Sequence, residues 1–173
     1  MVSARRALHL TAAALGAAGG LLSAAAASAQ PLEYAVKAAF LTKFAAFVTW
    51  PPGASGGPVR VCVVGEDPFG AALESAAPGQ VSVRRMPVVD RSSGCQVLYA
   101  SGSARQTVPQ ALAAVRGAPV LTVTDAARGG ARGMIHFVIF QDRVRFHVDA
   151  TQASQSGLAI SSKLMALGLS VKR

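Results

Sequence analysis

The sequence has few acidic residues, few aromatic residues and only two cysteines. Among its 173 residues, 8 are Asp or Glu and 17 are Lys or Arg, which gives a net charge of +9. Nucleic-acid binders usually concentrate positive charge in one stripe, whereas the arginines here are scattered along the chain. The composition therefore disfavours a nucleic-acid partner and favours a solvated basic surface, with an anionic partner or membrane head groups as the alternative.

The first residues differ in composition from the rest of the chain. Arg5 and Arg6 form a short positive segment, an uncharged Leu/Ala-rich run follows, and Ala27-Ser28-Ala29 has the small residues of a cleavage site. This order is typical of a secretory signal peptide. We therefore expect residues 1–29 to be removed by cleavage after Ala29 and the protein to be exported to the periplasm.

The remaining chain, residues 30–173, carries a net charge of +7. It has no uninterrupted apolar run of about 18 residues, the length that a membrane-spanning helix needs. A chain of this size is expected to bury its apolar residues around one core. We therefore expect a single exported domain over 30–173 with no membrane span in the mature chain.

Apolar segments of this region alternate between strand-like and helix-like patterns. The expected strands are Val59–Gly65, Val81–Met86, Cys95–Ala100 and Pro119–Thr124, and the expected helices are Glu33–Val48, Gly70–Ala77, Ala104–Arg116 and Thr151–Leu169. Strands that alternate with helices favour a mostly parallel sheet with helices on both faces. The pattern therefore predicts a three-layer α/β fold that ends in a helix.

An antiparallel hairpin is expected just before the last helix. Met134–Phe140 and Arg143–Asp149 alternate between apolar and polar residues on either side of Gln141-Asp142, which is typical of a hairpin. Symmetric pairing about this turn places His136 opposite His147.

Two facing imidazoles could hold a metal ion or respond to acid pH. A zinc site needs three or four ligands, and the nearest further candidate is Asp149. The favoured interpretation of His136 and His147 is therefore two ordinary polar positions on an exposed face, and we expect no bound metal.

The first expected helix has two different faces. Its aromatic and branched residues fall in one arc, and the opposite face carries no charge: Ala35, Ala38, Thr42, Ala45, Ala46 and Thr49. A solvent-facing helix usually carries charged residues there. Either alanine serves as a default helix former, or this face packs against a second subunit or another protein.

The two cysteines, Cys62 and Cys95, are expected to form one disulfide. An even number of cysteines in an exported chain favours a bridge, and both residues lie in or at the start of expected strands that could be neighbours. Two buried free thiols are the alternative. Because the chain has no Cys-x-x-Cys pair, the bridge would be structural rather than catalytic.

The turn after the first strand is the main candidate for ligand binding. Glu66 and Asp67 lie in Gly65–Gly70, where α/β folds place phosphate-binding turns. The turn lacks the glycine spacing of a dinucleotide fingerprint and the Gly-Lys-Ser/Thr of a P-loop. Asp67 is instead expected to cap a helix that begins at Pro68, although the position still allows a small anionic ligand.

No residues form a recognisable catalytic arrangement. Ser161-Ser162 has no histidine and aspartate in a known hydrolase pattern. We therefore expect no enzymatic activity, no catalytic residues and no cofactor.

Four segments together resemble the YfiR-like family. They are Glu33 to Pro51 (EYAVKAAFLTKFAAFVTWP), Cys62 to Gly70 (CVVGEDPFG), Gly133 to Phe137 (GMIHF) and Gly157 to Leu164 (GLAISSKL). They occur in the family's order, and the first of them is the most specific.

The resemblance implies a periplasmic α/β protein that can form a homodimer and has no enzymatic activity. Members of the family repress a membrane-bound diguanylate cyclase by binding its periplasmic portion, which lowers cyclic di-GMP and biofilm formation. The redox state of disulfides tunes that repression. Cys62 and Cys95 match the pair that the family widely shares, and a second pair found in some members is absent here. The alternative function is a periplasmic receptor for a small anionic or nucleotide-like ligand.

Overall fold

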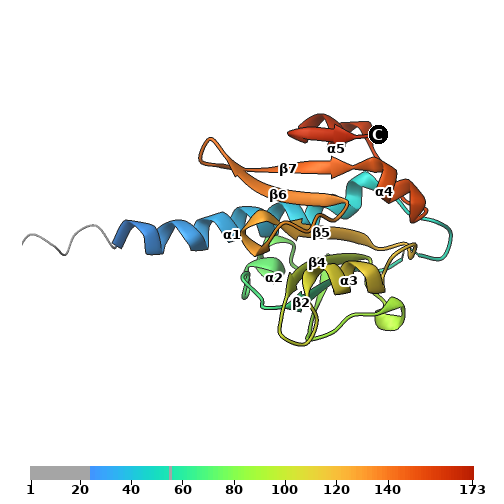
Figure 1. Cartoon of the computed structure of the whole chain (residues 1–173), viewed down its shortest axis with the longest axis horizontal. Helices are drawn as coiled ribbons and strands as arrows, with labels where there is room; N and C mark the ends of the chain where they lie inside the picture. The colour runs from blue at the N-terminus through green and yellow to red at the C-terminus, as the bar shows by residue number, and fades with distance from the viewer. Residues whose placement is uncertain (1–23, 55) are drawn as a thin grey trace, which may run out of the picture.

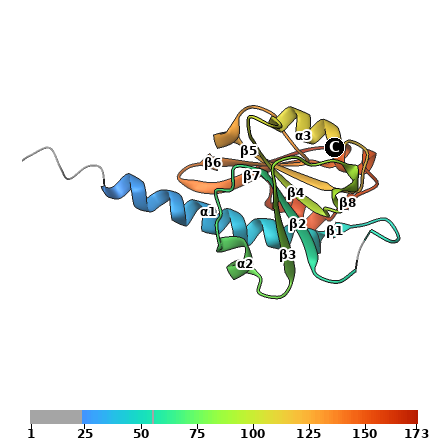
Figure 2. The same ribbon diagram turned by 90° about the horizontal axis from the view of Figure 1, so that it is seen from below.

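The computed structural model describes residues 24–54 and 56–173 (Figure 1). The first helix, α1 (Ala24–Phe44), contains the end of the expected signal peptide and its expected cleavage site. The rest of that expected segment, residues 1–23, lies outside the described residues. The N-terminal turns of α1 extend well beyond the body of the described chain, whereas its C-terminal half packs against the sheet (Figures 1 and 2).

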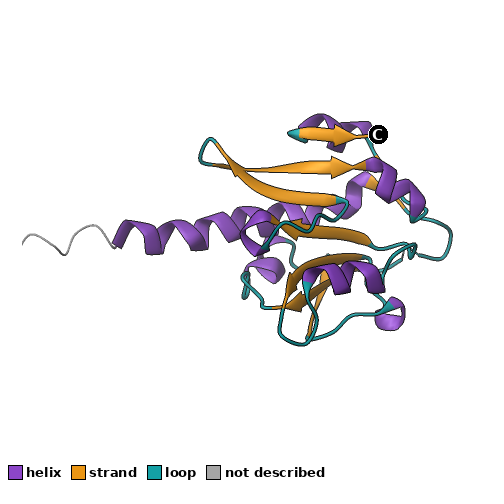
Figure 3. Cartoon of the chain, in the orientation of Figure 1, coloured by secondary structure: helices purple, strands orange, loops and turns teal. Residues whose placement is uncertain are grey.

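The other helices are short. They are the α-helices α2 (Ala72–Ala76), α3 (Val108–Ala114), α4 (Ala150–Gln155) and α5 (Ser162–Leu167), and the 3-10 helices η1 (Ala45–Phe47), η2 (Arg91–Ser93) and η3 (Ala126–Arg128). The strands are β1 (Val48–Thr49), β2 (Val59–Gly65), β3 (Val81–Met86), β4 (Val97–Gly102), β5 (Leu121–Asp125), β6 (Ile135–Phe140), β7 (Arg143–Asp149), β8 (Ala159–Ile160) and β9 (Ser170–Lys172). Figure 3 shows their distribution.

Seven of the described strands form one sheet in the order β3-β2-β4-β5-β6-β7-β9. Strands β2 to β6 are parallel, β6 and β7 form the antiparallel hairpin, and β9 lies parallel to β7. The predicted α/β fold with a mostly parallel sheet and a C-terminal hairpin is therefore confirmed. The register of the hairpin is also as predicted, with His136 opposite His147.

The two faces of the sheet are covered by different helices. Because side chains alternate along a strand, Val61 and Val63 of β2 join one core cluster and Cys62 and Val64 join the other. The first cluster includes α1 and α2, and the second includes α3. The expected three layers are thus present.

The boundaries of two expected helices shift for local reasons. The helix expected over Glu33–Val48 ends at Phe44, passes through η1, and continues as β1. The helix expected over Ala104–Arg116 begins at Val108, because Thr107 and Gln110 form a capping box at its start. These differences leave the layers unchanged.

The helix expected over Thr151–Leu169 is wrong as a continuous element. The chain instead forms α4, β8 and α5 over this range, and β9 follows it. Gly157 adopts φ = +72°, a left-handed conformation that ends α4, and Ser161 then caps α5 by accepting a hydrogen bond from the Leu164 N–H. The break places β8 beside β1, where Ile160 pairs with Val48.

Candidate functional site

The buried stripe that begins on α1 is broader than predicted: it includes Leu41, Phe44 and Val48 of the expected apolar arc and also part of the opposite face. Ala38, Thr42 and Ala45, which belong to the expected uncharged face, are buried within this chain, whereas Val36 of the expected apolar arc is exposed. That face is therefore not free to pack against a second subunit as a whole. A charged residue, Lys37, also lies in this buried stripe.

Lys37 forms a buried ion pair with the end of β5. Its side chain is fully buried, and its Nζ donates to Asp125 Oδ2 at 2.5 Å and also to the Glu33 carboxylate one turn earlier. The Tyr99 hydroxyl donates to the same Asp125 oxygen at 3.1 Å. The Asp125 carboxylate thus receives a lysine from α1 and a tyrosine from β4, which joins three elements.

Electrostatics keeps both donors of this cluster protonated. Burial alone would lower the pKa of Lys37, but its hydrogen bonds and charge interactions with Asp125 and Glu33 outweigh that effect and raise it. The pKa of Tyr99 is also raised, because burial and then the charge of Asp125 disfavour a phenolate. Because Lys37 and Tyr99 both stay protonated, this cluster is better suited to holding α1 on the sheet than to transferring protons.

An apolar groove lies beside this fixed helix, where α1, β7 and α5 meet. It has a volume of about 260 Å³, and Phe40, Val144, Phe146 and Leu167 supply its apolar lining. We call it the helix–hairpin groove. In both ribbon views the β6–β7 hairpin runs alongside α1 (Figures 1 and 2).

Exposed apolar side chains extend from the groove along both elements. Leu32 and Val36 precede Phe40 at four-residue intervals on α1, so they continue its stripe, and Ile139 pairs with Val144 across the hairpin. Leu32 is 68% exposed, Ile139 49% and Leu167 55%. Exposed apolar surface of this kind is characteristic of protein contact sites.

Phenylalanine rings form the base of the groove. Phe40 lies 5.6 Å from Phe146 and Phe44 lies 5.2 Å from it, between ring centroids, both in edge-on arrangements. Aromatic pairs of this geometry add stability beyond the area that they bury. The base is therefore rigid, while the rim at Leu167 and Val36 is open to solvent.

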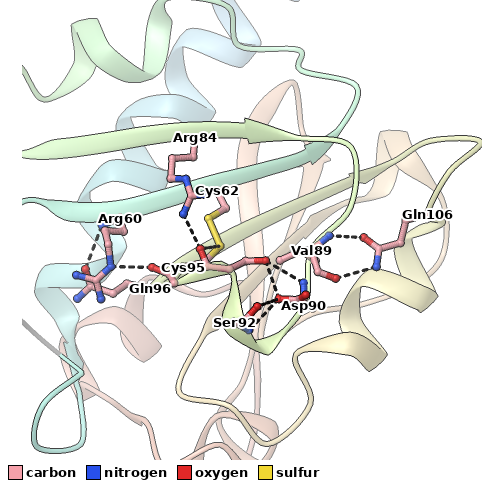
Figure 4. The surroundings of a disulfide bond; sticks show 11 residues. Arg60, Cys62, Arg84, Val89, Asp90, Ser92, Cys95, Gln96 and Gln106 are labelled. Carbon is pink, nitrogen blue, oxygen red and sulfur yellow. Dashed lines mark hydrogen bonds between the residues drawn. A yellow bond between two sulfur atoms is a disulfide. The ribbon is translucent and has the colours of Figure 1, made fainter.

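Cys62 and Cys95 form the predicted disulfide, which joins β2 to the segment just before β4 (Figure 4). Arginines hold the loop on the N-terminal side of Cys95: Arg84 donates to the Ser93 carbonyl and Arg60 to the Gly94 carbonyl, both at 2.7 Å. Cys62 is fully buried and Cys95 nearly so. The bridge is thus part of the core beneath α3.

The turn containing Glu66 and Asp67 has its charges paired within the chain. Asp67 Oδ1 accepts the Phe69 N–H at 2.8 Å and its Oδ2 pairs with Arg85. Glu66 pairs with Arg128 at 2.7 Å. The predicted helix cap by Asp67 is wrong, because α2 begins only at Ala72 and the Asp67 side chain closes the preceding turn instead.

His136 and His147 face each other with ring centroids 6.4 Å apart. His136 is not on an exposed face as predicted, since it is only 3% exposed and its Nδ1 lies 2.8 Å from the Thr124 hydroxyl. His147 Nδ1 lies 2.6 Å from the Ser170 hydroxyl. The expected third ligand, Asp149, caps α4 instead.

Burial lowers the pKa of both histidines, and the nearby charge of Arg132 lowers it further. Within residues 24–54 and 56–173, no group of three or more His, Cys, Asp or Glu side chains is arranged to hold a metal ion. The pair is therefore best described as neutral polar residues near the edge of the sheet.

These features define an α/β protein with a disulfide in its core and an exposed apolar groove suited to protein contact. The chain belongs to the YfiR/HmsC-like family, which it matches over residues 34–168, more than half of its length. This is a family of periplasmic regulators of diguanylate cyclases that are generally not catalytic. No curated protein matches the chain. Among the described residues, no helix has both the length and the apolar character that a membrane span requires.

Proposed function

We propose that this protein is a non-enzymatic periplasmic repressor that binds the periplasmic domain of a membrane-anchored diguanylate cyclase. The observation that carries the proposal is the helix–hairpin groove, together with the membership of the family. Binding holds the cyclase in an inactive arrangement, so that cyclic di-GMP and biofilm formation fall. Any signal that weakens binding shifts the cyclase toward its active state.

The groove has the properties of a protein-binding surface. Leu167 is exposed above a base of packed aromatic rings, and Arg143 and Arg145 add positive charge on the strand that lines it. Interfaces gain most of their affinity from a few apolar or aromatic anchors in a rigid pocket, with a polar rim around them. A partner that inserts an apolar side chain and carries acidic residues around it would match this surface.

A deletion strain complemented with single variants tests the proposal. Leu167→Asp places a charge on the lining of the groove, and Val36→Asp places one on the exposed apolar stripe of α1 that continues from it. Val88→Asp is the matched control, since Val88 is an exposed apolar residue outside the groove. We expect the deletion to raise the cellular level of cyclic di-GMP. Complementation with the wild type or with Val88→Asp should return that level to the lower value of the parent strain, whereas the Val36→Asp and Leu167→Asp variants should leave it high. An unchanged level in the deletion strain would contradict the proposal.

The protein is also proposed to form a homodimer. Sedimentation analysis of the purified wild type should give twice the mass of one chain, and a monomer at all concentrations would refute this part. If Leu167→Asp becomes monomeric while Val88→Asp stays dimeric, the groove is occupied by a second copy rather than by the cyclase.

Export is proposed to depend on residues 1–29. Cleavage after Ala29 would leave the part of α1 that contains Glu33 and Lys37 in the mature chain, so the ion pair with Asp125 would persist. N-terminal sequencing of the protein recovered from the periplasm should begin at Gln30. A product that still begins at Met1 would contradict this assignment.

A further inference from the structure

A cavity lies between α3 and α4, at the border between the two core clusters. It has a volume of about 470 Å³ and is formed by α3, the loop that precedes β6, and α4. Buried side chains of Val115, Thr122, Met134 and Ser156 contribute to its walls. Its size is in the range of pockets that enclose small molecules. We call it the α3–α4 cleft.

The only charged residues that line the cleft are Arg116 and Arg132. In the part of the chain that the structure describes, neither guanidinium forms an ion pair. Several other arginines of the described chain are unpaired as well, and what distinguishes Arg116 and Arg132 is that they line the same cavity. The α3–α4 cleft is thus positively charged and has no internal counterion, which favours an anion.

One residue of the cleft wall has an unused hydrogen-bond acceptor. The side-chain oxygen of Gln152, a residue of α4 that lines the cleft, is buried and has no hydrogen-bond partner. A buried polar atom without a partner is costly unless another molecule satisfies it. A ligand with a hydroxyl or amino donor would satisfy this oxygen once the Gln152 side chain turns toward the cleft.

The remaining lining is apolar. Leu112 and Val115 of the α3 region and Met134 before β6 offer side chains that an apolar group can contact. Guanidinium groups bind carboxylates and phosphates through paired, charge-assisted hydrogen bonds. The cleft therefore offers three kinds of contact to one small molecule.

We propose that the α3–α4 cleft binds a small organic anion, in which a carboxylate or phosphate is held by Arg116 and Arg132 and an apolar body lies against Leu112 and Met134. A hydroxyl or amino group of the ligand donates to Gln152. The cleft shares no lining residue with the helix–hairpin groove, so it does not depend on the proposed binding of a cyclase.

Four probes separate the contributions to binding. Mandelate has a carboxylate, a hydroxyl and a phenyl ring, phenylacetate lacks the hydroxyl, mandelamide lacks the charge, and phenyl phosphate replaces the carboxylate with a phosphate. Titration of the purified protein should show at least tenfold weaker binding of mandelamide than of mandelate, and weaker binding of phenylacetate than of mandelate. The comparison of mandelate with phenyl phosphate shows whether the cleft prefers a carboxylate or a phosphate.

Methyl NMR locates the bound probe. The Met134 methyl signal should shift on addition of mandelate or phenyl phosphate, while those of Met86 and Met165, which do not line the cleft, should stay in place. Unchanged Met86 and Met165 signals in each variant also show that the variant is folded.

Arg116→Gln and Arg132→Gln should each weaken binding of the preferred anion at least tenfold. Arg143→Gln is the matched control, because it removes the same charge from an exposed residue at the hairpin turn, away from the cleft. The proposal is overturned if Arg143→Gln weakens binding as much, if mandelamide binds as tightly as mandelate, or if neither anion shifts the Met134 signal up to its solubility limit.

Discussion

The two faces of the sheet are held together by different means. On the α1 face, large rings of Phe40, Phe44, Phe137 and Phe146 pack together, and a buried ion pair fixes the helix. On the α3 face the buried residues are smaller, including several alanines, and a disulfide lies among them. One face therefore depends on noncovalent packing and charge, and the other on a covalent bond.

The difference follows from how much apolar surface each face can bury. Large side chains gain more free energy on burial than alanine or valine does, so the α1 face can accommodate the desolvation of a lysine and an aspartate. The α3 face gains less from packing, and the bridge compensates by restricting the unfolded chain.

Removal of Lys37 should have the largest effect on this balance. Lys37→Met leaves the Asp125 carboxylate buried without its cation, and the loss of one partner of a buried ion pair costs about 3–5 kcal/mol. Denaturant unfolding measures the change. The double variant Lys37→Met/Asp125→Asn removes the stranded charge and should regain part of the loss. A single variant as stable as the wild type would show that the ion pair does not hold the α1 face.

Removal of the disulfide should destabilise the other face by a similar but somewhat smaller amount. The bridge spans a sequence separation of 33 residues, for which the chain-entropy model gives roughly 3–4 kcal/mol. Cys62→Ala, Cys95→Ala and the double variant should therefore lose about the same stability in denaturant unfolding. Thiol titration of the unfolded, unreduced wild type should find no free thiol, and two free thiols would contradict the bridge.

A smaller effect is expected from acid at His136 and His147. Their pKa values are lowered in the folded state by burial, and next by the charge of Arg132, whereas Asp125 opposes this for His136. The unfolded chain, with ordinary values near 6.5, therefore binds more protons. The free energy of unfolding should therefore be highest above about pH 6.5. It should fall as the pH decreases from there through the lowered pKa values of the two histidines.

The pH effect is measured by denaturant unfolding between neutral and mildly acid pH. His136→Gln and His147→Gln should each reduce the loss of stability on acidification, and His136→Gln should reduce it more because His136 is more deeply buried. Identical pH dependence in the wild type and the double variant would show that other groups cause the loss.

Much of the fold could be predicted from the sequence because its signals are local. The apolar pattern of Val59–Gly65 predicts a buried strand, and the alternation on either side of Gln141-Asp142 predicts a hairpin, whose turn residues indeed have positive φ angles. The two cysteines of an exported chain have one possible intramolecular partner each. For the last helix, the Ser156-Gly157 pair is a helix-end signal that could have revealed the break.

The candidate site was predictable only in part. Lys37 lies in a stripe of Leu41, Phe44 and other apolar residues, and its burial depends on Asp125, which is 88 residues away. No local pattern specifies such a partner. The sequence therefore predicts the buried Leu41, Phe44 and Val48 but not that the buried stripe of α1 extends to Lys37 and Ala38, and it does not separate the exposed apolar residues beside the groove from those of the core.

Periodicity and residue chemistry act over short stretches, so they specify most strands and helices and the register of the hairpin, and the two cysteines of an exported chain favour the Cys62–Cys95 bridge. The tertiary structure is needed to show how far the buried stripe of α1 extends, where its apolar surface stays open, and that Arg116, Arg132 and Gln152 line one cleft. Those features depend on contacts between residues far apart in the chain, whose free energies exist only once the sheet has brought them together.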